Sequence, residues 1–173
     1  MGVQGGFVLL WYQAGSESTE NREEGFLEAL KKYPGITVLS EEQRVDSDAQ
    51  GALKIGEALL RDHRDDVAGV FTVCEPNNKG MLLALENEQM AGKVKFVAFD
   101  SDPRMVEGLE KGTVHGVVLQ DPVRMGYLAV KTMVAHLRGE TVEKRLSTGE
   151  KLATPDNRDD PEMKALLSPK QFQ

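Results

Sequence analysis

The chain has 173 residues, of which 40% are hydrophobic, and its 21 Lys and Arg against 28 Asp and Glu give a net charge of −7. This length and composition predict a single globular domain with its own core. Binding to a nucleic-acid backbone requires a cluster of Lys and Arg, and the acidic composition gives no sign of one. Nucleic acid is therefore not an expected partner. No apolar run approaches the ~20 residues of a membrane-spanning helix.

Strands and helices are predicted to alternate along most of the chain. Short β-branched or aromatic runs are separated by amphipathic segments, and turn signals such as Pro34-Gly35 fall between them. The expected strands are 7–12, 36–39, 67–73, 93–99 and 114–119, and the expected helices are 18–33, 48–61, 76–90, 103–111 and 122–138. Residues 145–154 are expected to form a further extended segment, and 155–173 a surface-bound or disordered tail.

This order predicts an α/β fold with a three-layer, doubly wound parallel sheet. Consecutive parallel strands need crossover connections, and these place helices on both faces of the sheet. In such folds ligands bind beyond the carboxyl ends of the strands. The candidate site residues are therefore those that directly follow the strands, at 13–18, 41–47, 74–78, 100–103 and 120–124.

Several segments, in order and at matching spacing, resemble a known family. The first helix carries Arg-Glu-Glu-Gly-Phe at 22–26, the fourth strand ends in Val-Ala-Phe-Asp at 97–100, and Leu-Gln-Asp-Pro follows the fifth strand at 119–122. The segment 142–154 looks like the closing segment of transporter receptors. Together these features resemble the C-terminal half of periplasmic sugar-binding proteins of the ribose-binding type, the soluble receptors of ABC importers.

The resemblance implies one lobe of a type 1 periplasmic-binding-protein fold. In the family, two lobes close around a monosaccharide or related polyol, and the closed receptor meets an ABC permease. Residues 1–120 would form the sugar-binding lobe, 121–155 a crossing helix and extended segment that pack on the other lobe, and 156–173 a tail. The family is not enzymatic, and no cofactor is expected.

The resemblance also bears on location and completeness. The parent family is periplasmic or extracytoplasmic. No Lys or Arg precedes the apolar run 7–12, so no signal peptide is predicted in this chain. The chain is expected to be a truncated single lobe, in which monosaccharide binding is very weak or absent.

Three ligand-binding residues are implied by the resemblance. Residues at the positions of Arg22, Asp100 and Gln120 bond sugar hydroxyls in the family. Their chemistry suits this role, because guanidinium donates, carboxylate accepts and carboxamide does both. From the residues alone, simpler roles are a surface ion pair for Arg22, a helix cap for Asp100 and a loop amide for Gln120.

Two positions depart from the family pattern. Ser47 stands where the ribose-type proteins place an aromatic residue that stacks on the sugar, and Cys74 stands where they place an asparagine. Both positions stay in the predicted ligand-binding set, and Asn77 joins them because it, or Asn78, could supply the missing amide. Trp11 or Tyr12 could supply the missing ring. These departures make ribose itself a doubtful ligand.

The helix predicted at 122–138 has apolar residues on two faces. One stripe consists of Met125, Leu128, Ala129 and Thr132, and the other of Val130, Met133, Val134 and Leu137. A helix with two apolar faces needs two neighbours, and a large exposed apolar patch marks an interface. We therefore expect a homodimer through residues 122–138 or a rearranged packing of this helix.

Two other functional classes share the predicted fold. An α/β hydrolase would use Cys74 as nucleophile with His115 as base, but no recognisable third group orients the pair, and a buried structural thiol is the simpler role for Cys74. The effector-binding domain of a sugar-responsive transcription regulator would need a basic DNA-binding head before Gly6, which the sequence is not expected to supply.

Overall fold

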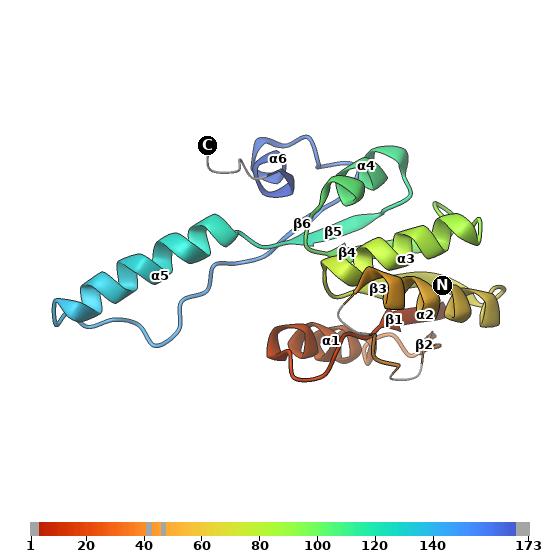
Figure 1. The fold of residues 1–173 in the computed structure, drawn as a ribbon, viewed down its shortest axis with the longest axis horizontal. Coiled ribbons are helices and arrows are strands. Elements are labelled where there is room, and N and C mark those ends of the chain that lie inside the picture. Colours follow the sequence, from red (N-terminus) through yellow and green to blue (C-terminus); the bar gives the residue numbers. More distant parts are fainter. Residues whose placement is uncertain (1–3, 41–42, 46–47, 169–173) are drawn as a thin grey trace.

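The computed structural model describes residues 4–40, 43–45 and 48–168 (Figure 1). The strands are β1 (Gly5–Leu10), β2 (Ile36–Val38), β3 (Val67–Thr72), β4 (Lys95–Phe99), β5 (Gly116–Leu119) and β6 (Lys151–Ala153). The helices are α1 (Glu17–Leu30), α2 (Ala49–Asp62), α3 (Glu75–Asn87), α4 (Pro103–Lys111), α5 (Pro122–Leu137) and α6 (Pro161–Leu167). The predicted alternation is confirmed, with boundaries shifted by a few residues.

The described strands form one six-stranded sheet in the order β2-β1-β3-β4-β5-β6. Strands β1 to β5 pair in parallel, and β6 pairs with β5 in the antiparallel direction. The predicted α/β class and doubly wound arrangement are confirmed, but the sheet is mixed and not wholly parallel. The order changes direction between β1 and β3, because β2 lies on one side of β1 and all later strands lie on the other.

Alternate residues of β1 divide the core into two layers. Val8 and Leu10 belong to the larger cluster, to which α2, α3, α4 and α6 contribute buried side chains. Leu9 points to the opposite face and belongs to a smaller cluster. Helix α1 covers that face, where Phe26 stacks on Phe71 of β3 with ring centroids 5.1 Å apart. The sheet therefore lies between two helical layers of unequal size.

Caps and first-turn prolines fix where the helices begin after the strands. Asp48 accepts a hydrogen bond from the Gly51 amide and caps α2. Asp102 accepts from the Arg104 and Met105 amides and caps α4. These side chains satisfy amides that the first turn leaves unpaired. Helices α2 and α4 therefore begin at residues that are fixed by their own side-chain caps.

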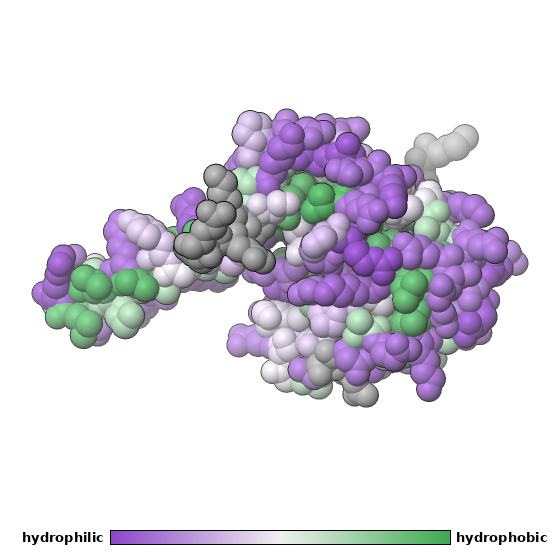
Figure 2. Space-filling view, turned by 45° about the horizontal axis from the view of Figure 1, so that its top comes forward, coloured by the Kyte–Doolittle hydropathy of each residue, from purple (hydrophilic) through white to green (hydrophobic). Residues whose placement is uncertain are grey.

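Helix α5 projects away from the rest of the lobe (Figure 1). None of its residues is buried, and hydrophobic side chains gather along its outer part (Figure 2). Within the described ranges, no helix is both long enough and apolar enough to span a membrane. The apolar surface of α5 is therefore left without a neighbour in this chain's described structure.

The C-terminal segment is more ordered than the sequence indicated. Within the expected tail, residues 161–167 form α6, and its Met163 and Leu167 are buried in the larger core cluster. Of the two alternatives for this tail, surface-bound or disordered, the second is therefore wrong for α6. Strand β6 lies within the segment 121–155 that was expected to pack on another lobe, yet it pairs with β5 of this lobe.

Candidate functional site

The candidate site is a row of polar side chains at the carboxyl ends of the strands. Trp11 and Tyr12 follow β1, Cys74 follows β3, Asp100 follows β4 and Gln120 follows β5. Parallel strands bring these ends to one edge of the sheet, as the sequence predicted for a ligand site. Ser47 lies outside the described residues, so its predicted role stays a prediction.

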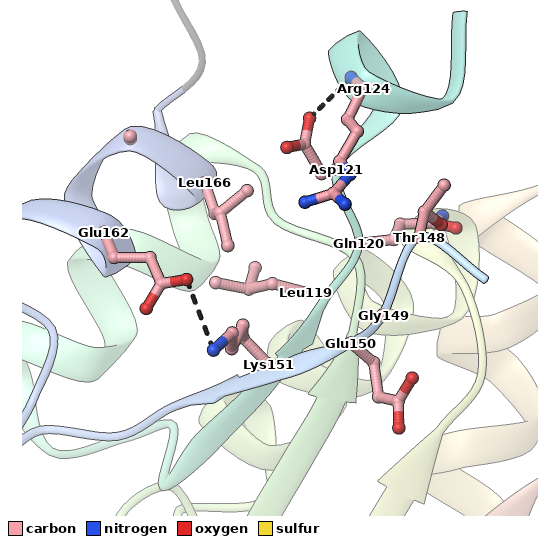
Figure 3. A pocket seen from close by; sticks show the side chains of 11 residues that line it. Leu119, Gln120, Asp121, Arg124, Thr148, Gly149, Glu150, Lys151, Glu162 and Leu166 are labelled. Atoms are coloured by element: carbon pink, nitrogen blue, oxygen red, sulfur yellow. Dashed lines mark hydrogen bonds and ion pairs between the residues drawn. The ribbon is translucent and has the colours of Figure 1, made fainter. Parts of the chain in front are cut away.

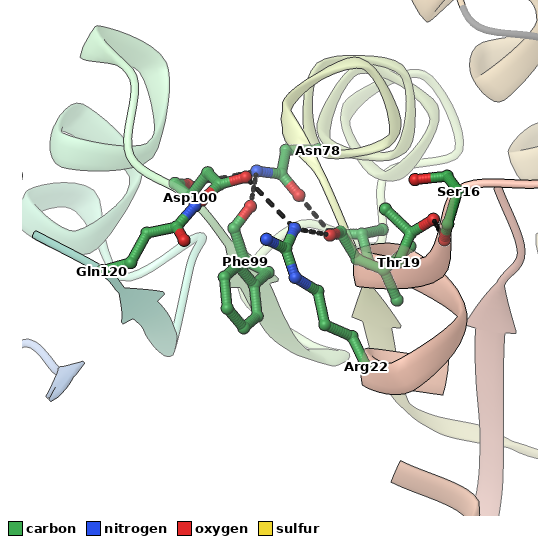
Figure 4. A network of polar contacts seen from close by, with 9 residues as sticks. Ser16, Thr19, Arg22, Asn78, Phe99, Asp100 and Gln120 are labelled. Atoms are coloured by element: carbon green, nitrogen blue, oxygen red, sulfur yellow. Dashed lines mark hydrogen bonds and ion pairs between the residues drawn. The ribbon is translucent and has the colours of Figure 1, made fainter. Parts of the chain in front are cut away.

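Three of the predicted residues form one hydrogen-bonded cluster (Figure 4). Arg22 Nη1 lies 3.4 Å from Asp100 Oδ2, and Gln120 Nε2 donates to Asp100 Oδ1 at 2.6 Å. These residues are 78 and 20 positions apart in the chain, so only the fold brings them together. The Asp100 carboxylate is therefore the centre of the cluster, and its two oxygens have different donors.

Asp100 adopts a backbone conformation that few residues tolerate. Its φ is +73°, and its amide donates to the Val118 carbonyl at 2.9 Å. Aspartate enters this left-handed region more readily than most residues, and such conformations gather at functional sites. The helix cap is Asp102, so the cap proposed as the simpler role of Asp100 is not its role. The turn aims the Asp100 carboxylate at Arg22 and Gln120.

Arg22 is fixed by contacts on three sides. Besides Asp100, its Nη1 donates to the Val73 carbonyl at 2.7 Å, and its guanidinium carbon lies 3.7 Å from the centre of the Phe99 ring. The side chain is only 15% exposed, so it is not the surface ion pair that sequence alone would favour. We call Arg22, Asp100 and Phe99 the Arg22 unit.

The two adjacent asparagines at the start of α3 hold different strand ends. Asn77 Nδ2 donates to the Leu10 carbonyl at 2.8 Å, and the same atom lies 3.3 Å from the Trp11 carbonyl oxygen. Asn78 Nδ2 donates to the Phe99 carbonyl at 2.7 Å and lies 3.2 Å from that of Asp100. Both asparagines are fully buried. Their side chains therefore hold the ends of β1 and β4 in place. The predicted ligand contact for Asn77 stays a prediction.

Cys74 occupies the N-cap position of α3 and is 8% exposed. Burial raises the pKa of its thiol to about 11. His115 directly precedes β5 and therefore lies at the opposite edge of the sheet from Cys74. The structure does not bring the predicted nucleophile and base together, and the thiol is poorly ionised at neutral pH.

A second cluster lies at the end of β1. Its Arg44 falls in the candidate segment 41–47 and its Trp11 was a candidate ring, but the sequence did not indicate that they meet. Arg44 Nη1 donates to the Tyr12 carbonyl at 2.9 Å and lies 3.3 Å from Glu23 Oε2. The other carboxylate oxygen of Glu23 accepts from the Tyr12 amide at 2.8 Å. The Arg44 guanidinium carbon lies 5.5 Å from the centre of the Trp11 ring. We call Arg44, Glu23 and Trp11 the Arg44 unit.

Glu23 is a buried acid, with a side chain only 2% exposed. Desolvation raises the pKa of its carboxyl, while the Tyr12 amide and Arg44 act in the opposite direction. One signal could have revealed it, since Glu23 lies at helical spacing from Thr19 and Phe26 on the inward face of α1. Arg44 stands in a polar loop without any periodic pattern, so no comparable signal marks it.

A small hollow lies beside the cluster, between the end of β5, the start of β6 and α6 (Figure 3). Its volume is about 200 Å³, and Gln120 lines it. The Lys151 ammonium lies 3.2 Å from the Glu162 carboxylate on its wall. Asp121, Arg124 and Glu150 also line the hollow, which therefore has a charged wall next to Gln120.

Comparison with known proteins places this geometry in a family. A family model described as a periplasmic binding protein domain matches residues 1–141. The chain is 29% identical to the D-allose-binding periplasmic protein of Escherichia coli over 135 residues, which are 78% of this chain and 43% of that protein. It is 30% identical to a ribose import binding protein of Haemophilus influenzae over 133 residues, which are 77% of this chain and 44% of that protein.

Solved structures agree with this similarity. An ABC transporter solute binding protein from Agrobacterium vitis, bound with α-D-tagatopyranose, matches with a TM-score of 0.89 and 30% identity, covering 95% of this chain and 54% of that one. A carbohydrate transporter solute binding protein from Agrobacterium radiobacter, in complex with D-arabinose, matches with a TM-score of 0.88 and 36% identity, covering 95% and 55%. The chain spans about half the length of these relatives.

A doubly wound lobe with polar side chains along its strand ends is the architecture of a solute-binding lobe. The chain belongs to the periplasmic binding protein domain family, whose model matches most of its length. The predicted resemblance to the ribose-binding type is confirmed, because the relatives include ribose- and allose-binding proteins and sugar-bound solute receptors.

Proposed function

We propose that this chain supplies one wall of a binding site for a monosaccharide or related polyol, as part of the solute-binding component of an ABC-type importer. The main support is the cluster of Arg22, Asp100 and Gln120 at the carboxyl ends of the strands. The names of the relatives support the ligand class, since they include proteins bound to or named for allose, ribose, tagatose and D-arabinose.

The cluster has the chemistry of a site for neutral hydroxyl groups. The Asp100 carboxylate is balanced by the Arg22 guanidinium, so the cluster adds no net charge. The Asp100 side chain is 26% exposed, and each of its oxygens can accept more than one hydrogen bond. A sugar hydroxyl can therefore donate to a carboxylate whose position is already fixed, which lowers the entropic cost of binding.

A titration followed by NMR tests this function. With D-ribose, D-allose, D-arabinose and D-tagatose, we expect saturable shifts at the strand ends around Asp100 and Gln120, in the millimolar range because one wall surrounds little of the ligand. Asp100→Asn should abolish the shifts, whereas Glu107→Gln on the exposed face of α4 should not change them. Absence of any saturable shift with every sugar, both in the chain alone and in its fusion to the missing half of a relative, would contradict the proposal.

Transport by the whole receptor is a further part of the proposal. A second lobe would close on the ligand, and the closed form would meet an ABC permease outside the cytoplasmic membrane, where the named periplasmic relatives act. The predicted role of 121–155 in contacting that lobe agrees with the exposed surface of α5. Fusing the chain to the missing half of a relative should give sugar affinity at least ten-fold above that of the chain alone.

We also propose that the chain by itself forms a homodimer through α5. Val123, Tyr127, Val130, Val134 and Leu137 are all at least 40% exposed, and their spacing of four and three residues forms one straight stripe. A second copy would bury this stripe against its own. Light scattering should show a dimer that Val130→Glu converts to a monomer, whereas a monomer of the unmodified chain at high concentration would contradict this.

An enzymatic role for Cys74 receives no support from the site. With a thiol pKa of about 11, alkylation of the folded chain by iodoacetamide at pH 8 should be ~100-fold slower than that of an exposed cysteine. Denaturation should restore the ordinary rate. Fast alkylation of the folded chain would instead indicate an activated thiol.

A further inference from the structure

The Arg22 unit and the Arg44 unit contain the same kinds of groups. In each, an arginine donates to a carbonyl at a strand end, pairs with a carboxylate and lies over an aromatic ring. In the Arg22 unit the carboxylate is the more exposed partner of the ion pair, and in the Arg44 unit the guanidinium is. The Asp100 side chain is 26% exposed against 15% for Arg22, whereas Arg44 is 27% exposed against 2% for Glu23. The first unit therefore presents a carboxylate, and the second presents a guanidinium.

The Arg44 unit lies where the sheet order changes direction. Trp11 follows β1 and packs against the small core cluster that contains Cys74, which follows β3. A crevice opens beyond such a reversal point because the chain leaves the two strands toward opposite sides, and ligands bind there in open α/β sheets. Val73 contacts Arg22 through its carbonyl and directly precedes Cys74. The two units are therefore neighbours along one edge.

Two buried polar atoms at this point have no partner among the described residues. They are Trp11 Nε1 and Asn77 Oδ1, and the Asn77 side chain is fully buried. Buried polar atoms in native proteins nearly always have a partner, so each exception calls for an explanation. Their position between the ends of β1 and β3 indicates that the polar site extends beyond the Arg22 unit.

Resting on the proposed function, we infer that Arg44 contacts the bound sugar and sets its orientation, and that Glu23 is the positioning residue that holds Arg44 in place. A guanidinium only donates hydrogen bonds, and a carboxylate only accepts them. The ring oxygen of a cyclic sugar can only accept. In this orientation the ring oxygen accepts from the exposed Arg44 guanidinium, and the hydroxyl groups of the sugar donate to Asp100.

This orientation predicts discrimination between a ring sugar and its open-chain alditol. D-arabinitol carries the hydroxyl groups of D-arabinose but has no ring oxygen. The unmodified chain should bind D-arabinose more tightly than D-arabinitol, as measured by NMR titration. Arg44→Gln should weaken D-arabinose binding about ten-fold and bring the two affinities together, because one charged hydrogen bond is lost. Arg44→Lys should restore part of the preference.

Glu23 is tested through the emission of Trp11, the single tryptophan of the chain. Glu23→Gln removes the charge that holds Arg44 but keeps an acceptor for the Tyr12 amide. We expect acrylamide quenching of Trp11 to rise about two-fold without any sugar and D-arabinose affinity to fall, while circular dichroism stays unchanged. Arg61→Gln, at a 54% exposed arginine on α2, is the matched control and should change neither readout.

The outcomes separate this inference from the proposed function. Sugar binding that Arg44→Gln leaves unchanged, with the same preference for D-arabinose over D-arabinitol, would overturn the inference and leave the proposed function standing. Absence of sugar binding both by the unmodified chain and by its fusion to the missing half of a relative would overturn both. Unchanged quenching in Glu23→Gln would overturn the positioning role of Glu23, whatever the sugar affinities.

Discussion

The Arg22 unit and the Arg44 unit use similar parts with opposite burial. The carboxylate of the first, Asp100, reaches solvent, and the carboxylate of the second, Glu23, does not. A partly exposed ion pair is screened by water and contributes little to folding, whereas a buried acid depends on every group that surrounds it. This difference in burial shows that two similar sets of groups can have different roles. One carboxylate is available to a ligand, and the other fixes the position of its arginine.

The largest difference between the units should appear in stability. Glu23→Ala removes an acceptor from the partly buried Tyr12 amide and the counter-charge from Arg44, so we expect a loss of about 3 kcal/mol in the free energy of unfolding. Asp100→Asn keeps a residue that tolerates the left-handed turn and should cost at most about 1 kcal/mol. Urea unfolding measures both. Equal losses would show that the burial difference has no energetic meaning.

A smaller difference is expected between the asparagines that brace the two strand ends. Asn78 also accepts from the Thr72 hydroxyl of β3 at 2.6 Å. Asn78→Ala therefore removes a partner from this hydroxyl and from the Phe99 carbonyl of β4. We expect a loss of about 2 kcal/mol. Asn77→Ala should cost about 1 kcal/mol, because its Oδ1 has no partner to lose among the described residues. Thermal unfolding measures both losses, and a larger loss for Asn77→Ala than for Asn78→Ala would contradict this expectation.

The smallest effect concerns pH and depends on Glu23 alone. Burial raises the pKa of this carboxyl above the ordinary 4.5, so the folded chain holds its proton to higher pH than the unfolded chain does. The contribution to stability is complete below pH 4.5 and is lost as pH rises through the folded-state pKa. The groups that face Glu23 are Tyr12, Arg44, Glu20 and Cys74.

The measurement for this effect is the difference in unfolding free energy between the unmodified chain and Glu23→Gln. This difference should fall as pH rises from the ordinary glutamate pKa through the raised folded-state pKa of Glu23. A difference that stays constant with pH would show that the Glu23 carboxyl ionises equally easily in both states.

Most of the fold could be predicted from the sequence because its elements are long and periodic. The run 67–73 and the capped helices have strong local patterns, and their order dictates crossover connections. Helix α6 escaped prediction because it has only 7 residues, and Met163 and Leu167 are its only buried positions. The direction of β6 depends on pairing with β5, which no local pattern in a 3-residue strand reveals.

The candidate site was only half predictable. Arg22, Asp100 and Gln120 were selected by resemblance, and their mutual contacts follow once the strand ends are aligned. The Arg44 unit joins a loop, a helix face and a strand end that are 32 and 21 residues apart in sequence. Its arginine has no signature beyond its charge. Contacts of this kind depend on where the loop is placed, and the sequence pattern does not determine that.

Because β5 and β6 pair in the antiparallel direction, helix α5 could be removed by protein engineering without breaking the sheet. Leu119 and Lys151 are paired neighbours across the two strands, although 31 intervening residues separate them in the chain. A short hairpin turn of the kind that joins adjacent antiparallel strands could therefore replace α5 and its return segment. The product would be a minimal lobe that retains the sheet, α6 and the Arg44 unit, to which other modules could be grafted at one defined point.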